Sequence, residues 1–149
     1  MNIVTVTMGF EIGQCNGSMH IDIADQSSNI LSLGSLIENT HSVTFDVAWP
    51  NRLTVTLSNK DMRRDTQIDK EGNIVADKYV KLIYMSVNGF KLSQSALYKI
   101  CQYVVSGQEV TNEVYWGFQG KVIIDFDKPT PTRWNFHLNN VLFFRNDNQ

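Results

Sequence analysis

Apolar residues recur at every second position over several short stretches of this chain, which is the periodicity of a half-buried β-strand. The clearest stretches are residues 3–8, 20–24, 42–49, 53–57, 121–126 and 134–138. Pro50 and Asn51 suit the second and third positions of a turn, so the two stretches that flank them predict a hairpin.

Two further segments carry strong turn signals. Residues 67–74 predict a second hairpin, because Gly72 can adopt the positive φ that a hairpin tip requires. Residues 78–87 are apolar on both faces, which is typical of a strand in the middle of a sheet. An Asn-Gly pair at positions 88 and 89 ends that strand.

Three other segments are less regular. Gly9, Gly13 and Gly17 predict a loop or a broken strand after the first strand. Residues 30–37 are compatible with a short helix, a loop or a strand. Residues 93–104 fit a helix capped by a serine at position 93 or 95, and they fit a strand equally well.

Together these elements predict a mainly β fold with at most one or two short helices. Roughly eight or more short strands with turn signals at regular intervals are typical of an antiparallel β-sandwich, here jelly-roll-like. The 149 residues suit a single domain over positions 1–149. No internal repeat, linker or low-complexity segment divides the chain.

Charge and cysteine content exclude several functions. A net charge of −2 without a basic patch argues against a nucleic-acid binder. No apolar run approaches the length of a membrane span, and the N-terminal residues do not resemble a signal peptide. We therefore expect synthesis in the cytoplasm. Cys15 and Cys101 lack metal-ligand spacing and are expected to be buried free thiols in a reducing compartment.

Acidic residues gather between positions 61 and 77, and they are the candidate metal ligands: Asp61, Asp65, Asp69 and Asp77. Calcium takes about six to eight oxygen ligands, so an Asp-rich loop is able to bind it. The EF-hand pattern fails, since aligning its glycine with Gly72 puts Lys78 at the bidentate glutamate position. The competing interpretation, which we favour, is that these carboxylates are solvated and pair with nearby Arg63, Arg64, Lys70 and Lys78.

Aromatic residues supply the candidate ligand-binding positions. Tyr115 and Trp116 are neighbours on an expected strand, so they point to opposite faces and one of them is expected to be exposed. A flat exposed ring beside amide and carboxylate groups is typical of a sugar-binding surface. Burial beneath a neighbouring subunit is the alternative. Trp49 and Trp134 lie on apolar faces and are expected in the core.

Catalysis finds little support in the sequence. His20, His41 and His137 share no metal-ligand spacing, and no serine or cysteine lies in a nucleophile motif. A glycosidase needs two positioned carboxylates, which three aspartates on expected strands are able to supply: Asp22, Asp46 and Asp125. Outward-facing aspartates on half-buried strands are usually only solvated, so we predict that the protein is not an enzyme.

Residues 42–126 resemble a group of small, poorly characterised proteins of tailed bacteriophages. The recurring elements are Asp65-Thr66, Asp69, Gly72-Asn73-Ile74, Ala76-Asp77-Lys78 and Trp116-Gly117-Phe118. The strand order, ending in Val87-Asn88-Gly89, is also similar to calcium-dependent xylan-binding modules with a jelly-roll fold. Those modules are normally secreted and often contain disulfides, whereas we expect no signal peptide here, and a disulfide between Cys15 and Cys101 is possible but has no support in the sequence.

Two hypotheses follow from these resemblances. The first is a virion structural or accessory subunit, in the capsid decoration, collar or tail, that docks on other virion proteins or on copies of itself. The second is a carbohydrate-binding module, calcium-assisted or not, that attaches to host or environmental glycans. Neither requires nucleic acid or a membrane as a partner.

Overall fold

The computed structural model describes residues 2–49 and 52–126 of the chain. Within them the chain forms thirteen β-strands and one short α-helix. These are β1 (Asn2–Gly13), β2 (His20–Ala24), β3 (Asn29–Leu33), β4 (Thr40–Trp49), β5 (Arg52–Ser58), β6 (Thr66–Ile68), β7 (Ile74–Asp77), β8 (Tyr79–Val87), β9 (Phe90–Lys91), α1 (Gln94–Ile100), β10 (Cys101–Val104), β11 (Thr111–Asn112), β12 (Tyr115–Trp116) and β13 (Gly120–Asp125).

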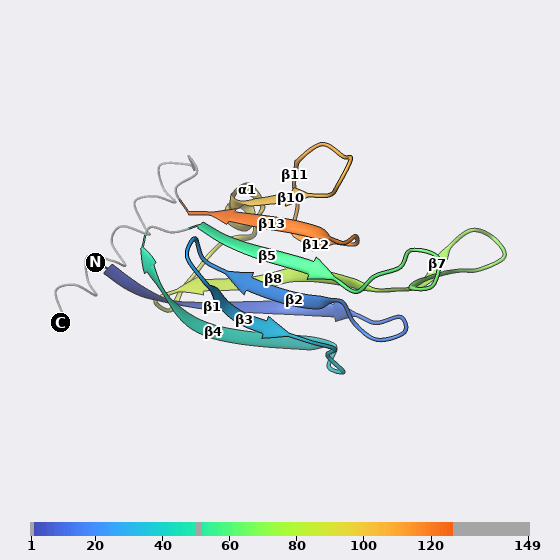
Figure 1. Ribbon diagram of the computed structural model, residues 1–149, viewed down its shortest axis with the longest axis horizontal. Helices are drawn as coiled ribbons and strands as arrows, with labels where there is room; N and C mark the ends of the chain where they lie inside the picture. Colours follow the sequence, from blue (N-terminus) through green and yellow to red (C-terminus); the bar gives the residue numbers. More distant parts are fainter. Residues whose placement is uncertain (1, 50–51, 127–149) are drawn as a thin grey trace.

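The strands build two antiparallel sheets that face each other across one core (Figure 1). The first sheet has the order β12-β8-β1-β4, with β9 added to β8, and the second has the order β11-β10-β13-β5-β2-β3. A separate hairpin of β6 and β7 projects from one end. This arrangement confirms the predicted mainly β sandwich with a single short helix. The predicted domain of residues 1–149 extends beyond the described residues and stays a prediction.

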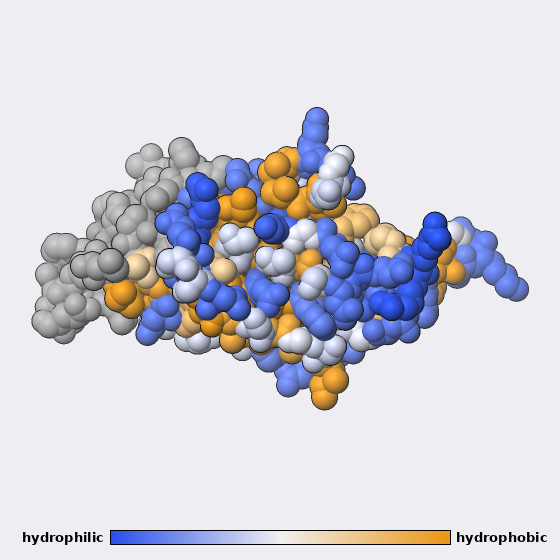
Figure 2. Space-filling view, viewed as in Figure 1, coloured by the Kyte–Doolittle hydropathy of each residue, from blue (hydrophilic) through white to orange (hydrophobic). Residues whose placement is uncertain are grey.

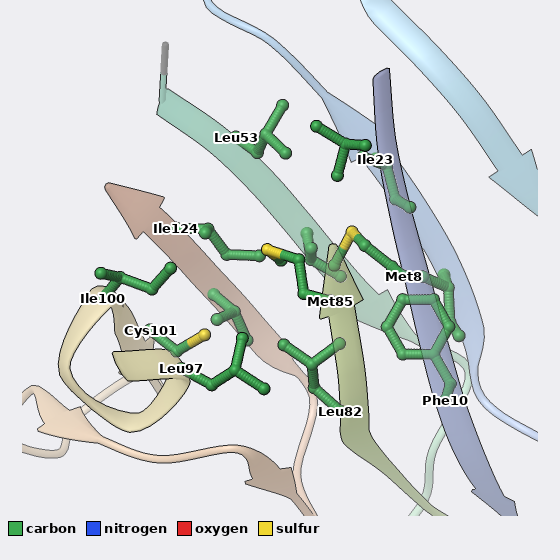
Figure 3. Packing of buried hydrophobic residues seen from close by; sticks show 14 of the residues in the cluster. Met8, Phe10, Ile23, Leu53, Leu82, Met85, Leu97, Ile100, Cys101 and Ile124 are labelled. Carbon is green, nitrogen blue, oxygen red and sulfur yellow. The ribbon is translucent and has the colours of Figure 1, made fainter. Parts of the chain in front are cut away.

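The core consists of the inward-facing residues of both sheets, together with one face of the helix (Figure 3). Met8 and Phe10 of β1 and Leu82 of β8 come from the first sheet, whereas Ile23 of β2 and Ile124 of β13 come from the second. All five side chains are fully removed from solvent. Their burial is the main stabilising contribution to the sandwich, because apolar area leaves water on both inner faces.

The predicted hairpin of residues 42–57 is wrong. β4 pairs with β1 in the first sheet, whereas β5 pairs with β2 and β13 in the second. The two strands therefore lie in opposite layers. Their alternation shows only that each strand has one buried face, and this holds equally for two strands in one sheet and for two strands in facing sheets. Pro50 and Asn51 themselves lie outside the described residues.

The predicted break in the first strand at Gly9 and Gly13 is also wrong, because β1 continues through both glycines. In the register of β1 with β8, Gly9 lies opposite Tyr84 and Gly13 opposite Tyr79. A Cβ atom at Gly13 would lie 2.0 Å from the Tyr79 ring. The glycine therefore leaves room for an aromatic ring that lies across the strand.

Residues 30–37 and 93–104, whose sequences are compatible with more than one element, have definite structures. Part of residues 30–37 belongs to strand β3, which pairs with β2. Residues 93–104 contain both predicted elements in succession. Ser93 caps helix α1 by accepting a hydrogen bond from the Ala96 amide, and the helix ends at Cys101, which pairs with Ile124 of β13.

Several other predictions are confirmed. Gly72 has a φ of 86° at the tip of the β6–β7 hairpin, and Asn88 and Gly89 have φ values of 51° and 81° in the turn after β8. Strand β8 lies between β12 and β1, as its two apolar faces predicted. None of the helices among the described residues has the length and apolarity to cross a membrane.

Both cysteines are buried and free, as expected. Burial raises the pKa of the Cys101 thiol to about 12. The predicted strand at 134–138, with Trp134 and His137, lies outside the described residues, and so does the side chain of Trp49.

Candidate functional site

A shallow groove lies at the end of the sandwich that carries the β6–β7 hairpin, and we call it the aromatic groove. Tyr103, Tyr115 and Phe118 supply rings to it. Gln108, Glu109, Thr111 and Glu113 supply polar groups. Its volume is about 240 Å³, which is below the roughly 300–1,000 Å³ of enclosed small-molecule pockets. The groove therefore offers a surface for one part of a larger ligand.

Tyr115 and Trp116 have opposite environments, as their neighbouring places on a strand predict. The Tyr115 side chain is 41% exposed and lines the groove. Trp116 is fully buried, its ring centroid lies 6.3 Å from that of Phe10, and its indole N–H donates to the Glu113 carbonyl at 2.8 Å. The prediction of Trp116 as a ligand contact is therefore corrected, because strand alternation directs its side chain into the core. Ligand binding by Tyr115 stays a prediction.

The Tyr115 ring is held in place by a second tyrosine. It stacks on Tyr79, with ring centroids 4.8 Å apart and planes inclined by 24°. The Tyr79 hydroxyl donates to Glu11 at 2.7 Å, and this hydrogen bond raises the pKa of Tyr79 to about 12. Burial raises the pKa of Tyr115 as well. Both hydroxyls are therefore neutral at physiological pH, and the pair presents a fixed, uncharged platform.

The groove wall at residues 117–119 is fixed by a buried lysine. The Lys60 ammonium donates to the Gly117 carbonyl at 2.5 Å and to the Asp77 carboxylate at 2.7 Å. The Lys60 backbone amide donates to the Gln119 side chain at 3.0 Å. On the other side the Tyr103 hydroxyl bonds both the amide and the carbonyl of Phe118. The site is therefore preorganised, and binding has little loop ordering to overcome.

The acidic segment next to the groove is organised by ion pairs and hydrogen bonds. Asp65 is fully buried and pairs with Lys78 at 3.2 Å and with Arg64 at 2.9 Å. The hydrogen bond from Arg64 is the main cause that lowers the pKa of Asp65 far below its usual range, with further contributions from the Asp61 amide and Lys78. These pairs are the ones favoured in the sequence interpretation, but Asp65 and Lys78 are buried rather than solvated.

The other three aspartates are also engaged separately. Asp77 accepts hydrogen bonds from Lys60 and from the Thr66 hydroxyl. Asp69 accepts backbone amides in the hairpin turn, and Asp61 accepts the Arg63 amide. No three potential ligands converge in the described part of the chain. The metal site at Asp61, Asp65, Asp69 and Asp77 therefore stays a prediction, and in this structure each of the four carboxylates accepts hydrogen bonds from lysine, arginine, threonine or backbone N–H groups.

Of the three aspartates considered for hydrolysis, Asp46 lies on a different sheet from the other two. Asp46 lies on the outer face of the first sheet and accepts a hydrogen bond from Thr5. Asp22 and Asp125 lie on strands of the second sheet, where alternate residues are buried. Asp125 also pairs with Arg52 at 3.4 Å. Asp46 is thus separated from the other two by the thickness of the sandwich.

A second, larger groove lies on the outer face of the first sheet, and we call it the sheet groove. Its volume is about 480 Å³, and Gly9, Glu38, His41, Ser42, Ile83 and Tyr84 are among its lining residues. The sequence interpretation did not identify it. The feature that marks this groove is the pairing of Tyr84 on β8 with Gly9 on β1. The sequence does not show which strands are neighbours, so it could not reveal that pairing.

No protein family matches the sequence, and no curated protein matches it. Two solved structures are similar in fold. The first, vCBM60 in complex with galactobiose, is 13% identical with a TM-score of 0.51, and the match covers 81% of this chain and 97% of that one. The chain shares the fold of a carbohydrate-binding module.

The second is vCBM60 in a structure described as an evolutionary link, by circular permutation, between two families of calcium-dependent carbohydrate-binding modules. It is 12% identical with a TM-score of 0.48, and the match covers 82% of this chain and 90% of that one. At 13% identity the likeness to the first structure concerns the fold, and that likeness confirms the expected β-sandwich.

Proposed function

We propose that this chain is a non-catalytic carbohydrate-binding module whose ligand contacts the aromatic groove. The observation that carries the proposal is the exposed Tyr115 ring, which stacks on Tyr79 beside the carboxylate-lined groove. The fold likeness to a module solved with galactobiose supports it.

The groove offers the two kinds of contact that sugars need. The apolar face of a pyranose ring stacks on the open face of Tyr115 or on Phe118, which is also exposed. Sugar hydroxyl groups donate to Glu109 and Glu113 or bond Gln108 and Thr111. A groove that is shallow and already ordered suits reversible binding to a long polymer.

The test is affinity electrophoresis against a panel of neutral and acidic plant and bacterial polysaccharides. Tyr115→Ala is compared with Tyr98→Ala, which removes an equally large exposed ring from helix α1, outside the groove. Loss of one stacking contact is worth about 1 kcal/mol, so we expect affinity to fall by roughly five- to tenfold for Tyr115→Ala only. Equal retardation of both variants, or no retardation of the parent protein by any polysaccharide, contradicts the proposal.

Our second proposal is the virion subunit, which the comparisons do not address. The projecting hairpin offers an observation in its favour, since its apolar side chains Ile68, Ile74 and Val75 are 60%, 63% and 62% exposed. Exposed apolar residues on a projecting element suit docking on a neighbouring protein. Light scattering of the purified chain tests this proposal. We expect a closed oligomer, and we expect Ile74→Asp to dissociate it. A monomer at all concentrations excludes self-assembly.

A further inference from the structure

The outer face of strand β8 connects the aromatic groove to the sheet groove. Val80, Leu82 and Met85 point from β8 into the core, so Tyr79 and Tyr84 face outward. A register shift between Gly9 and Phe10 of β1 allows an odd and an even position of β8 to share this face. The two tyrosines therefore lie on one side of one strand.

Each of these tyrosines lies opposite a glycine of the neighbouring strand. A Cβ atom at Gly13 would overlap the Tyr79 ring, and one at Gly9 would lie 3.1 Å from the Tyr84 Cβ. Strand β1 therefore has no side chain at the two positions directly opposite the rings. Outward-facing rings with low neighbours are suited to stacking against a flat ligand.

The sheet groove repeats the chemistry of the aromatic groove. Tyr84 supplies its ring, and the Lys91 ammonium lies 5.5 Å from the centroid of that ring. On the opposite wall, Thr40 and Ser42 supply hydroxyl groups, and His41 pairs with Glu38 at 3.1 Å. Hydroxyl and carboxylate groups beside one aromatic ring make a second surface with hydrogen-bonding capacity for sugar hydroxyls.

The spacing of the two sites sets the kind of ligand. Tyr79 and Tyr84 lie opposite Gly13 and Gly9, which are four positions apart on β1, so the two tyrosines are roughly 13 Å apart along the strand. A disaccharide in the aromatic groove is too short to contact Tyr84 at the same time. A linear chain of several sugars that follows β8 passes over Lys81 and Ile83 and contacts both grooves.

We propose that the outer face of β8 binds an internal stretch of a linear polysaccharide, with one subsite at Tyr115 and Tyr79 and a second at Tyr84. This inference rests on the proposed carbohydrate-binding function and names its ligand class, a polymer chain rather than a chain end or a disaccharide. The two subsites act on one ligand, so occupation of the first raises the effective concentration of sugar at the second.

The test is isothermal titration of the parent chain with galacto-oligosaccharides and xylo-oligosaccharides from dimer to hexamer. We expect affinity to rise at least about tenfold between dimer and hexamer. Tyr84→Ala removes this rise and leaves dimer affinity unchanged, whereas Tyr115→Ala weakens every length. Tyr84→Phe keeps the ring and keeps the rise.

Ser42→Ala removes a hydroxyl group that lines the same groove from β4 and leaves the packing of β8 intact, so it serves as a second variant in case Tyr84→Ala does not fold. We expect it to reduce hexamer affinity and to leave dimer affinity unchanged. Dimer and hexamer affinities that are equal in the parent chain, or a length dependence that survives both Tyr84→Ala and Ser42→Ala, overturn the extended site while the proposed function stands. Failure of every oligomer and every polysaccharide to bind overturns the proposed function itself.

Discussion

The acidic segment from Asp61 to Asp77 has a base and a tip with different environments. At the base, the side chains of Asp65 and Lys78 are fully removed from water, that of Lys60 is almost so, and that of Asp77 is 15% exposed. At the tip, Asp69, Lys70 and Glu71 are exposed, and Figure 2 shows hydrophilic residues gathered at this end of the molecule. Similar charges along a short stretch therefore hold the structure together at one end and are solvated at the other.

The difference teaches what a buried ion pair requires. Each charge at the base has several partners, because Lys78 also donates to the Asn59 carbonyl and Asp65 also accepts the Asp61 amide. Removing one charged side chain of the pair leaves the other buried without an opposite charge. The resulting loss of folding free energy is far larger than the stability that the intact pair adds relative to two apolar side chains. The base is thus the sensitive part of the hairpin.

The largest expected effect comes from Asp65→Ala, which leaves Lys78 buried without its carboxylate. We expect the free energy of unfolding to fall by about 3–5 kcal/mol, measured by urea denaturation. Asp69→Ala at the tip is the matched control, and loss of its turn hydrogen bonds is expected to cost about 1 kcal/mol. Equal losses in both variants would remove the distinction between base and tip.

Lys60→Met comes next, since it breaks hydrogen bonds to Gly117 and Asp77 and leaves an apolar chain of similar length. We expect a loss of about 1.5–3 kcal/mol of stability. Because Lys60 fixes residues 117–119, polysaccharide retardation is also expected to weaken in conditions where the variant is fully folded. Unchanged retardation would show that the groove wall is held by Tyr103 alone.

Acid should destabilise the base of the segment through Asp65. The pKa of Asp65 is lowered in the folded chain, so its stabilising contribution is complete above the unfolded-state pKa of about 3.9 and is lost as the pH falls below that value. We expect the urea midpoint to decline below about pH 5 in the parent chain. The decline should be shallower in Asp65→Ala, and identical slopes would assign the acid sensitivity to other carboxylates.

The smallest expected effect is that of calcium removal. Because the four aspartates already accept hydrogen bonds from the protein, EDTA should change neither the melting temperature nor polysaccharide retardation. Differential scanning fluorimetry with added calcium and then with EDTA measures the first. A shift with calcium that Asp61→Asn abolishes would show that the segment rearranges to bind a metal.

Alternation of apolar and polar residues predicted the strands well, since burial of one face leaves a direct mark on the sequence. Nothing local marks which strand lies beside which, so the predicted pairing of residues 42–49 with residues 53–57 was wrong. The same limit applied to the site. Strand alternation placed Tyr115 and Trp116 on opposite faces without showing which of them is exposed. Tyr84 lines the sheet groove, and Tyr79 and Lys60 support the aromatic groove, through contacts between segments that are distant in sequence.

The close packing of Tyr79 against Gly13 has a consequence for the history of this chain. Any side chain at position 13 would displace the Tyr79 ring. Any smaller residue at position 79 would leave the backbone of β1 at Gly13 without the ring that covers it. The two positions are therefore expected to change together in any relative that keeps the tyrosine pair. A search that pairs the two β1 glycines with the two β8 tyrosines would recognise such relatives even where the rest of the sequence has diverged.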